Sequence, residues 1–150
     1  LFKNHPYEEV AFEVTTLENF NQNIGMGMVG ELEKETNALE FLQFVKNKMN
    51  ASCIKHSELI KNPIKKVAVL GGSGSFASQA AKSANADVLI TSDLKYHDFF
   101  TAEKQIILAD IGHYESERFT KNFLADYLSK KFTNFAVVLS TTNTNPVKYL

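Results

Sequence analysis

The sequence is poor in two features that mark whole classes of protein: surplus positive charge and long apolar runs. Sixteen lysines and arginines stand against seventeen acidic residues, which gives a formal net charge of -1. No basic stripe that could follow a phosphate backbone is visible. No apolar run approaches the roughly 18 residues that a membrane-spanning helix needs. We therefore expect neither a nucleic acid nor a membrane as a partner.

Cysteine is also scarce, and the single Cys53 excludes an internal disulfide and fits a reducing compartment. Cys53 sits in an apolar stretch, so we expect a buried packing residue rather than a reactive thiol. Hydrophobic residues make up 44 % of the chain and charged residues 22 %, which is ordinary for a globular protein. These observations together predict a cytoplasmic protein with a hydrophobic core of its own.

The first segment of the chain has the alternating pattern of a strand. Residues 7–16 place Val10, Phe12 and Val14 on one face. An unpaired apolar edge of this kind invites pairing with another chain, so we expect a dimer or a larger homo-oligomer.

A polar loop, a second strand and a helix are expected next, with the loop at residues 19–27 and the strand at 26–32. Thr36 can cap the helix. The apolar residues of this helix recur at spacings of three and four and predict a buried stripe, formed by Leu39, Leu42, Val45 and Met49.

From residue 65 onward, short apolar runs alternate with helical segments. The runs predict strands at residues 67–70, 86–91, 105–110 and 135–140, and the segments predict helices at 76–84, 96–104 and 115–130. The last helix is expected to turn four side chains inward: Phe119, Phe123, Leu124 and Tyr127. Because the hydrophobic residues of these strands are continuous rather than alternating, and helices follow the strands, we predict an α/β fold with a largely parallel sheet and helices on both faces.

Polar segments follow each of the predicted strands of this second part, at residues 71–75, 92–97, 110–117 and 141–145. The carboxyl ends of parallel strands meet at one edge of a sheet, and open α/β sheets bind their ligands there. The sequence therefore predicts a site where these segments converge.

His113 and Glu117 are four residues apart at a predicted helix start, just after Gly112 at the strand exit. Side chains at this spacing lie on one side of a helix, about 5–6 Å apart at Cβ. An imidazole and a carboxylate presented in this way suit Zn, Mn or Fe. Alternatively, His113 caps or packs, while Glu115 and Glu117 favour the positive helix N-terminus.

Asp93 and His97 form a second pair at the same spacing, after a neighbouring strand. If they converge with His113, they could serve as catalytic base, acid or orienting group. Asp93 could instead be a helix N-cap, and His97 could be a hydrogen-bonded packing residue.

A glycine-rich turn lies between the strand at 67–70 and the next helix. The backbone N–H groups of Gly72, Ser73, Gly74 and Ser75 could attract a phosphate, together with the helix N-terminus. The turn is neither the lysine-bearing nucleotide loop nor a full dinucleotide fingerprint. A tight turn with a serine N-cap explains the same residues.

Three of these stretches, in this order, resemble the Nif-three-like proteins, also catalogued as domain-of-unknown-function 34 and labelled GTP cyclohydrolase type 2 homologues. The stretches are residues 67–75 (VAVLGGSGS), 90–97 (ITSDLKYH) and 110–117 (DIGHYESE). Residues 5–10 (HPYEEV) resemble the end of a small PII-like domain that some members carry as an insertion. The resemblance implies that residues 1–16 are a remnant strand of that insertion and that 17–150 are the C-terminal half of the α/β domain.

The resemblance also implies a ring-shaped homohexamer with two divalent metal ions (Zn, Mn or Fe) in a cleft. His113 and Glu117 would be metal ligands, with Asp93 and His97 nearby. The other ligands of such proteins, a neighbouring histidine pair and an aspartate, come from an N-terminal half, and this chain has no His–His pair. The chain is thus expected to supply only part of the site and need not hold metal by itself.

Two functions are compatible with this resemblance. The first is a metal-dependent hydrolase acting on a small nucleotide or another phosphate-bearing substrate, since two metal ions can activate water and hold both oxygens of the reacting group. The second is a metal-binding scaffold or regulatory protein without catalytic turnover.

Overall fold

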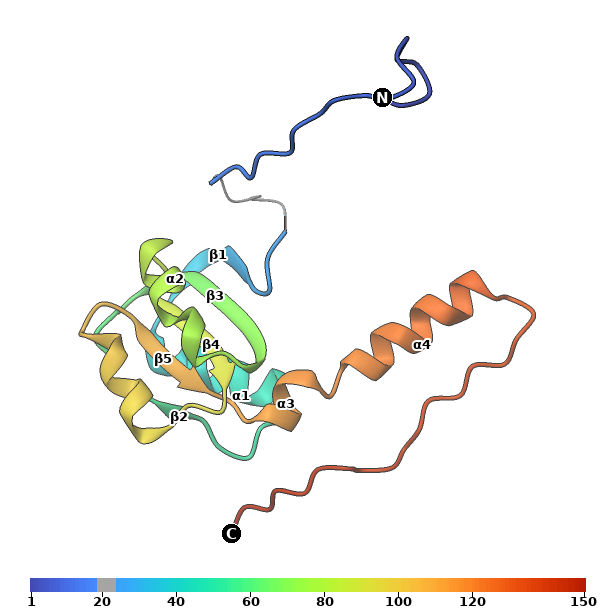
Figure 1. Cartoon of the computed structure of the whole chain (residues 1–150). Helices are drawn as coiled ribbons and strands as arrows, with labels where there is room; N and C mark the ends of the chain where they lie inside the picture. Colours follow the sequence, from blue (N-terminus) through green and yellow to red (C-terminus); the bar gives the residue numbers. More distant parts are fainter. Residues whose placement is uncertain (19–23) are drawn as a thin grey trace.

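A single sheet organises the computed structural model, which describes residues 1–18 and 24–150. Its five strands lie in the order β1-β3-β4-β5-β2 (Figure 1). Their bounds are β1 Met28–Thr36, β2 Lys55–His56, β3 Ile64–Ser73, β4 Val88–Ser92 and β5 Ile107–Asp110. Residues 19–23, most of the predicted loop at 19–27, lie outside the described residues. In the part that the structure describes, no helix has both the length and the apolarity to cross a membrane.

The centre of the sheet is parallel, as the continuous apolar runs predicted. β3 pairs with β4 and β4 with β5 in parallel, whereas β1 and β2 are antiparallel edge strands. Every residue of β4 and β5 is buried. The largely parallel α/β sheet predicted from the sequence is therefore confirmed.

Helices cover both faces of the sheet, because successive side chains of a strand point to opposite sides. Val88 and Ile90 of β4 pack with helix α1, whereas Leu89 between them packs with Ala81 and Ala102 on the other face. The helical segments are α1 Ala38–Lys48, α2 Ser78–Ser83, α3 His113–Glu117 and α4 Thr120–Lys131, with short 3-10 helices η1 Ser75–Ala77 and η2 Tyr96–Ala102.

Helix α1 begins one residue later than predicted. Asn37, and not Thr36, is the cap residue, and its side chain accepts hydrogen bonds from the N–H groups of Leu39 and Glu40. Leu39, expected in the buried stripe, is exposed, since the buried face of α1 is formed by Ala38, Phe41, Leu42 and Val45.

Two of the predicted strands do not form. Residues 7–16 run as extended, mostly exposed chain away from the sheet, and residues 135–140 are also without strand structure (Figure 1). A segment with alternating or continuous hydrophobic residues forms a strand only where another strand pairs with it. The assignment of residues 1–16 to a PII-like insertion stays a prediction.

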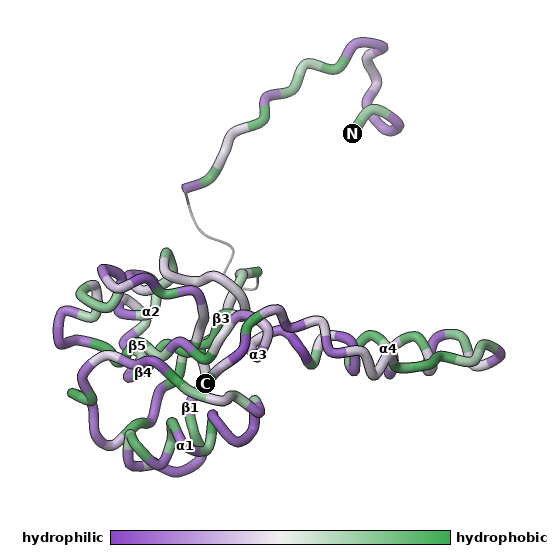
Figure 2. Tube along the Cα trace, turned by 90° about the horizontal axis from the view of Figure 1, so that it is seen from below, coloured by the Kyte–Doolittle hydropathy of each residue, from purple (hydrophilic) through white to green (hydrophobic). Residues whose placement is uncertain are grey.

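The helix predicted at residues 115–130 is two helices, α3 and α4, separated by a turn at Arg118 and Phe119. Helix α4 projects from the body of the molecule, and none of its residues is buried. Phe123 is 69 % exposed, so the predicted inward face of this helix is wrong for the chain as described. Figure 2 shows α4, with hydrophobic and hydrophilic residues along its length, extending away from the sheet.

Candidate metal centre

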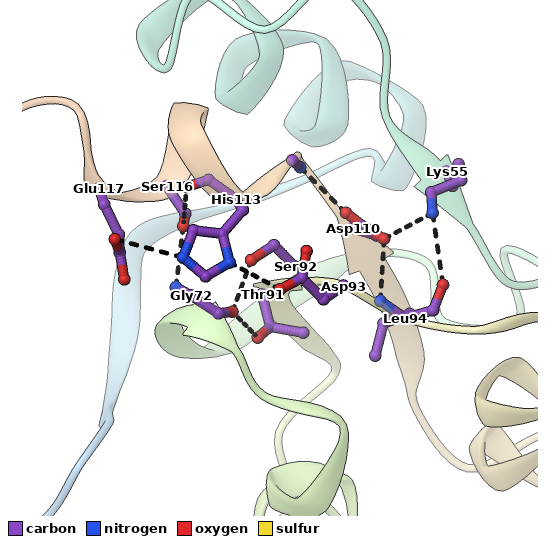
Figure 3. Close-up of polar contacts among 11 residues, drawn as sticks. Lys55, Gly72, Thr91, Ser92, Asp93, Leu94, Asp110, His113, Ser116 and Glu117 are labelled. Atoms are coloured by element: carbon purple, nitrogen blue, oxygen red, sulfur yellow. Dashed lines mark hydrogen bonds and ion pairs between the residues drawn. The ribbon is translucent and has the colours of Figure 1, made fainter. Parts of the chain in front are cut away.

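Three chain segments at the carboxyl edge of the parallel strands bring the predicted site residues together. Gly72 lies at the end of β3, Asp93 directly follows β4, and His113 opens α3 two residues after Ile111. Figure 3 shows these residues converging around the imidazole of His113. The convergence predicted from the polar segments is present in the fold for these three segments.

The imidazole of His113 lies between two carboxylates. Its Nδ1 atom is 2.6 Å from Oδ2 of Asp93, and its Nε2 atom is 3.4 Å from Oε2 of Glu117 (Figure 3). An Nδ1–H group that donates to Asp93 leaves the lone pair of Nε2 directed toward Glu117. The structure thus brings Asp93 into direct contact with the ring of His113, while its role as base, acid or orienting group stays a prediction.

The two carboxylates change the protonation of His113. The hydrogen bond to Asp93 is the main reason that the pKa of His113 is raised above its ordinary 6.5. Partial burial lowers this pKa, while the negative charges of Asp93 and Glu117 raise it further. The site thus favours a positive charge at the ring, either a proton or, by the same electrostatics, a cation bound to Nε2.

His113 and Glu117 fit two positions of a metal coordination shell. With bonds of about 2.0–2.2 Å, two neighbouring ligands of a tetrahedral ion are about 3.4 Å apart, and the two ligand atoms here are 3.4 Å apart. Both side chains are about half exposed, at 52 % and 54 %, so an ion can reach them. Within residues 1–18 and 24–150, no group of three or more His, Cys, Asp or Glu side chains is placed to hold an ion. The described residues therefore offer a pair of ligands rather than a complete site.

The alternative readings of His113 and Asp93 as caps do not match the helix starts. Gly112 is the residue before α3, and Lys95 is the residue before η2. Glu115 lies in the first turn of α3, as the alternative for this residue expected, and it is buried and accepts a hydrogen bond from the side chain of Asn145.

Gly72 makes room for the ligand pair. Its φ of +69° is unfavourable for other residues, and a Cβ atom there would lie 2.6 Å from Oε1 of Glu117. Its N–H donates to Oγ of Ser116, and its carbonyl accepts from the hydroxyls of Thr91 and Ser92. Gly72 therefore ties the end of β3 to both α3 and β4.

Some backbone N–H groups of the glycine-rich turn already face acceptors within the protein and are therefore less available to an anion than the sequence suggested. The N–H of Gly74 faces the carbonyl of Ser92 at 3.4 Å, and that of Gly72 is used as described. Anion binding by Gly72, Ser73, Gly74 and Ser75 stays a prediction, with two of the four N–H groups already facing acceptors in the protein.

The structure does not bring His97 to the other site residues. Its exposed ring contacts Tyr96 and Phe100 on η2, at centroid distances of 5.2 and 6.4 Å. His97 is absent from the lining of the cavity beside His113. Its predicted part in proton transfer stays a prediction.

A cavity of about 970 Å³ opens beside the ligand pair. Asp93, His113 and Glu117 line one side, and the C-terminal segment that returns from α4 contributes Asn145 and Tyr149. Burial, and then the charge of Glu115, raise the pKa of the Tyr149 hydroxyl above its ordinary 10.0.

Asp110 and Lys55 were not identified from the sequence as functional residues of this edge, and the environment predicted for Cys53 is wrong. Asp110, although almost fully buried, forms an ion pair of 2.8 Å with Lys55 of β2. A charged residue that ends an otherwise apolar strand was the available signal. Cys53, predicted to be buried, is exposed in the segment between α1 and β2 and lines the cavity.

Comparison with known proteins gives consistent matches over nearly the whole chain. A protein named GTP cyclohydrolase 1 type 2 homolog from Staphylococcus epidermidis is 36 % identical over 154 residues, covering 99 % of this chain and 42 % of the relative. A Bacillus subtilis protein of the same name is 36 % identical over 155 residues, covering 100 % and 41 %. The chain therefore spans less than half the length of these relatives.

Solved structures agree with the fold. Staphylococcus aureus protein SA1388 superimposes with a TM-score of 0.78 at 29 % identity, over 99 % of this chain and 49 % of that one. A Bacillus cereus protein related to NIF3 gives a TM-score of 0.72 at 29 % identity, over 99 % and 42 %. The family model described as Duf34/NIF3 (NGG1p interacting factor 3) matches residues 5–146. With the relatives at 36 % identity, this match shows that the chain belongs to the Duf34/NIF3 family.

Proposed function

We propose that this chain supplies His113 and Glu117 as ligands of a divalent metal centre in a hydrolase. The metal is Zn, Mn or Fe, and the substrate is a nucleotide or another small phosphate-bearing molecule. The observation that carries the proposal is the 3.4 Å separation of Nε2 of His113 and Oε2 of Glu117, with Asp93 bonded to the other nitrogen of the ring.

The side chains around the site have separate tasks in this proposal. Asp93 holds the proton on Nδ1 and so keeps Nε2 available as a ligand, as carboxylates behind metal-binding histidines do. Glu117 adds a negative oxygen, and Gly72 leaves the space that this oxygen needs. A bound divalent ion would lower the pKa of a water molecule and polarise the bond to be cleaved.

The lining of the cavity is mixed in charge, with four carboxylates beside its cations, and one of these cations, Lys55, is paired with Asp110. In this proposal a metal ion held by the carboxylate side and the cations together bind an anionic substrate. Three cationic side chains face the same cavity as the ligand pair: Lys55, Arg118 and Lys121. Guanidinium and ammonium groups bind phosphate oxygens well. The name shared by the relatives, GTP cyclohydrolase 1 type 2 homolog, agrees with a nucleotide-related role.

The remaining expectations from the family resemblance belong to the same proposal. They are a second metal ion, further ligands from elsewhere in the complete protein, a ring-shaped homohexamer and a cytoplasmic location. The described residues contribute two ligands, so the proposal requires that the others come from outside these residues.

A metal-binding scaffold without turnover is the second candidate. The position of His97 favours it, because the side chain expected to move protons lies outside the cavity. In this case the site would bind an ion, and the protein would act through partners.

Elemental mass spectrometry of the complete gene product that contains these 150 residues tests the metal centre. We expect bound metal in the natural protein and its loss when His113→Ala and Glu117→Ala are combined. His56→Ala with Glu58→Ala is the matched control, since it removes an exposed histidine and glutamate elsewhere in the chain. A natural protein that stays empty when supplied with Zn, Mn and Fe would refute the proposal.

A hydrolysis screen of the metal-loaded protein separates the two candidates. A panel of nucleotides and phosphoesters should yield at least one product that the His113→Ala, Glu117→Ala double variant does not form. Bound metal without turnover of any compound in the panel would favour the scaffold.

A further inference from the structure

Asp110 occupies a central position between the two loops that carry Asp93 and His113. It is the last residue of β5, and it is only 3 % exposed. Its Oδ2 atom accepts a hydrogen bond of 3.0 Å from the N–H of Leu94, and its Oδ1 atom accepts one of 3.0 Å from the N–H of Gly112. Those two N–H groups belong to the residues directly next to Asp93 and His113, so one carboxylate joins both loops (Figure 3).

Lys55 completes this arrangement from the edge strand β2. Its Nζ atom is 2.8 Å from Oδ2 of Asp110 and donates a hydrogen bond of 3.3 Å to the carbonyl of Leu94. A buried carboxylate is costly unless it is paired and hydrogen-bonded. Asp110 has a cation and two backbone donors, so its charge is compensated at the point where the loops leave the sheet.

Both loops turn sharply next to the residues that Asp110 holds. Asp93 has a φ of 58° and Gly112 a φ of 92°, both in the left-handed region. Aspartate tolerates this region better than most non-glycine residues, and contacts with the rest of the fold can hold either residue in it. The hydrogen bond from Leu94 to Asp110 is one such constraint, and the hydrogen bond from Gly112 is its counterpart in the other loop.

We infer that Asp110 is a positioning residue for the candidate metal centre. Its carboxylate, supported by Lys55, fixes the spacing of the two loops and thereby the hydrogen bond between Asp93 and His113. That bond selects the Nδ1–H tautomer, which directs Nε2 toward Glu117. This inference rests on the proposed function in one respect, the expected effect of Asp110 on metal affinity. The expected effect of Asp110 on the tautomer of His113 does not depend on the proposed function, because the tautomer can be measured in the metal-free protein.

The test uses Asp110→Asn in the complete gene product. An asparagine has one acceptor oxygen, so it can serve one of the two backbone N–H groups but not both. The first measurement is the tautomer of His113 in the metal-free protein, read from ¹⁵N shifts of labelled histidine at a pH where the ring is neutral. The signal is assigned by its loss in His113→Gln. The second measurement is Zn²⁺ affinity.

We expect Asp110→Asn to reduce the Nδ1–H tautomer of His113 and to weaken Zn²⁺ binding by about 10–100-fold, the range typical of residues behind metal ligands. Lys55→Met should change both quantities in the same direction and by less, because both loop N–H groups keep their acceptor. Lys82→Met is the matched control. It breaks an ion pair of 2.6 Å with Glu103, and Lys82 does not line the cavity.

The inference is overturned if Asp110→Asn folds and keeps the natural tautomer and a Zn²⁺ Kd within about twofold of the natural protein. If Asp110→Asn does not fold, the Lys55→Met variant tests the inference instead. The inference is then overturned if the tautomer ratio of His113 in Lys55→Met equals that in Lys82→Met. A natural protein that binds none of Zn, Mn and Fe but whose tautomer responds as expected would refute the metal proposal and support the role of Asp110.

Discussion

The Oδ2 atom of Asp93 lies 2.6 Å from Nδ1 of His113, although the two residues are 20 positions apart and follow different strands. The parallel pairing of β4 with β5 brings their carboxyl ends together, and Thr91 of one strand is in register with Asp110 of the other. The parallel pairing of the two strands therefore creates the contact, and the contact is the main reason that the pKa of the imidazole is raised.

Asp93→Asn should lower the pKa of His113 toward its ordinary 6.5, because the variant removes the carboxylate that is the main cause of the raised pKa. In the natural chain, His113 stabilises the fold fully below its unfolded pKa, and this contribution is lost as the pH rises through the raised folded pKa. An NMR titration of the metal-free protein measures the pKa. Asp98→Asn is the control, since the Asp98 carboxylate accepts from Lys95 N–H instead. A His113 pKa that stays as high in Asp93→Asn as in Asp98→Asn would contradict the assignment.

Zn²⁺ binding should weaken as the pH falls through the raised pKa of His113, because a proton and the metal compete for the same imidazole. The loss should therefore begin at a higher pH than for a histidine of ordinary pKa. In Asp93→Asn the midpoint should move to lower pH, while the affinity at high pH falls by about 10–100-fold. Isothermal titration at several pH values measures both effects. A midpoint that moves upward in the variant would count against the role given to Asp93.

The centre of the fold was predictable because its signals are local. β4 and β5 each begin with a continuous apolar run and are buried on both faces, so period and composition identify them without knowledge of their partners. Residues 7–16 also have a strand pattern, but a strand needs a partner, which no local pattern supplies. For the same reason, apolar periodicity in residues 119–127 could not show whether anything covers that face.

The candidate site was predictable in part for related reasons. The spacing of His113 and Glu117 is enough to predict that their side chains lie next to each other, because both residues lie on α3, where residues four apart are neighbours. The same spacing was no guide for Asp93 and His97, since Asp93 lies before η2 and the two residues do not share a helix. Asp110 was missed because two of its partners are backbone N–H groups, which leave no trace in the pattern of side chains.

Gly72→Ala should disturb the ligand pair and weaken Zn²⁺ binding. The new Cβ would lie 2.6 Å from Oε1 of Glu117, and the left-handed backbone at φ +69° would become strained. The strain should cost about 1–2 kcal/mol of unfolding free energy. Denaturant unfolding and a Zn²⁺ titration measure the two effects.

Gly30→Ala is the matched control for this substitution, because a Cβ at Gly30 in β1 meets no atom within 4 Å. It should leave Zn²⁺ affinity unchanged. If Gly72→Ala bound Zn²⁺ as tightly as Gly30→Ala, the close approach of Gly72 to Glu117 would have no functional importance.

The exposure of α4 predicts opposite outcomes for two phenylalanines in the 150-residue chain. Phe41 of α1 is 5 % exposed in the core, whereas Phe123 of α4 is 69 % exposed. Phe41→Ala should lower the free energy of unfolding by about 3–5 kcal/mol, because it leaves a cavity in the core. Phe123→Ala should change this free energy by no more than about 0.5 kcal/mol, as is usual at an exposed position. Urea unfolding of both variants checks the difference, and each serves as the other's control because the same atoms are removed. A loss of more than about 2 kcal/mol for Phe123→Ala would mean that α4 packs its apolar side against another part of the molecule.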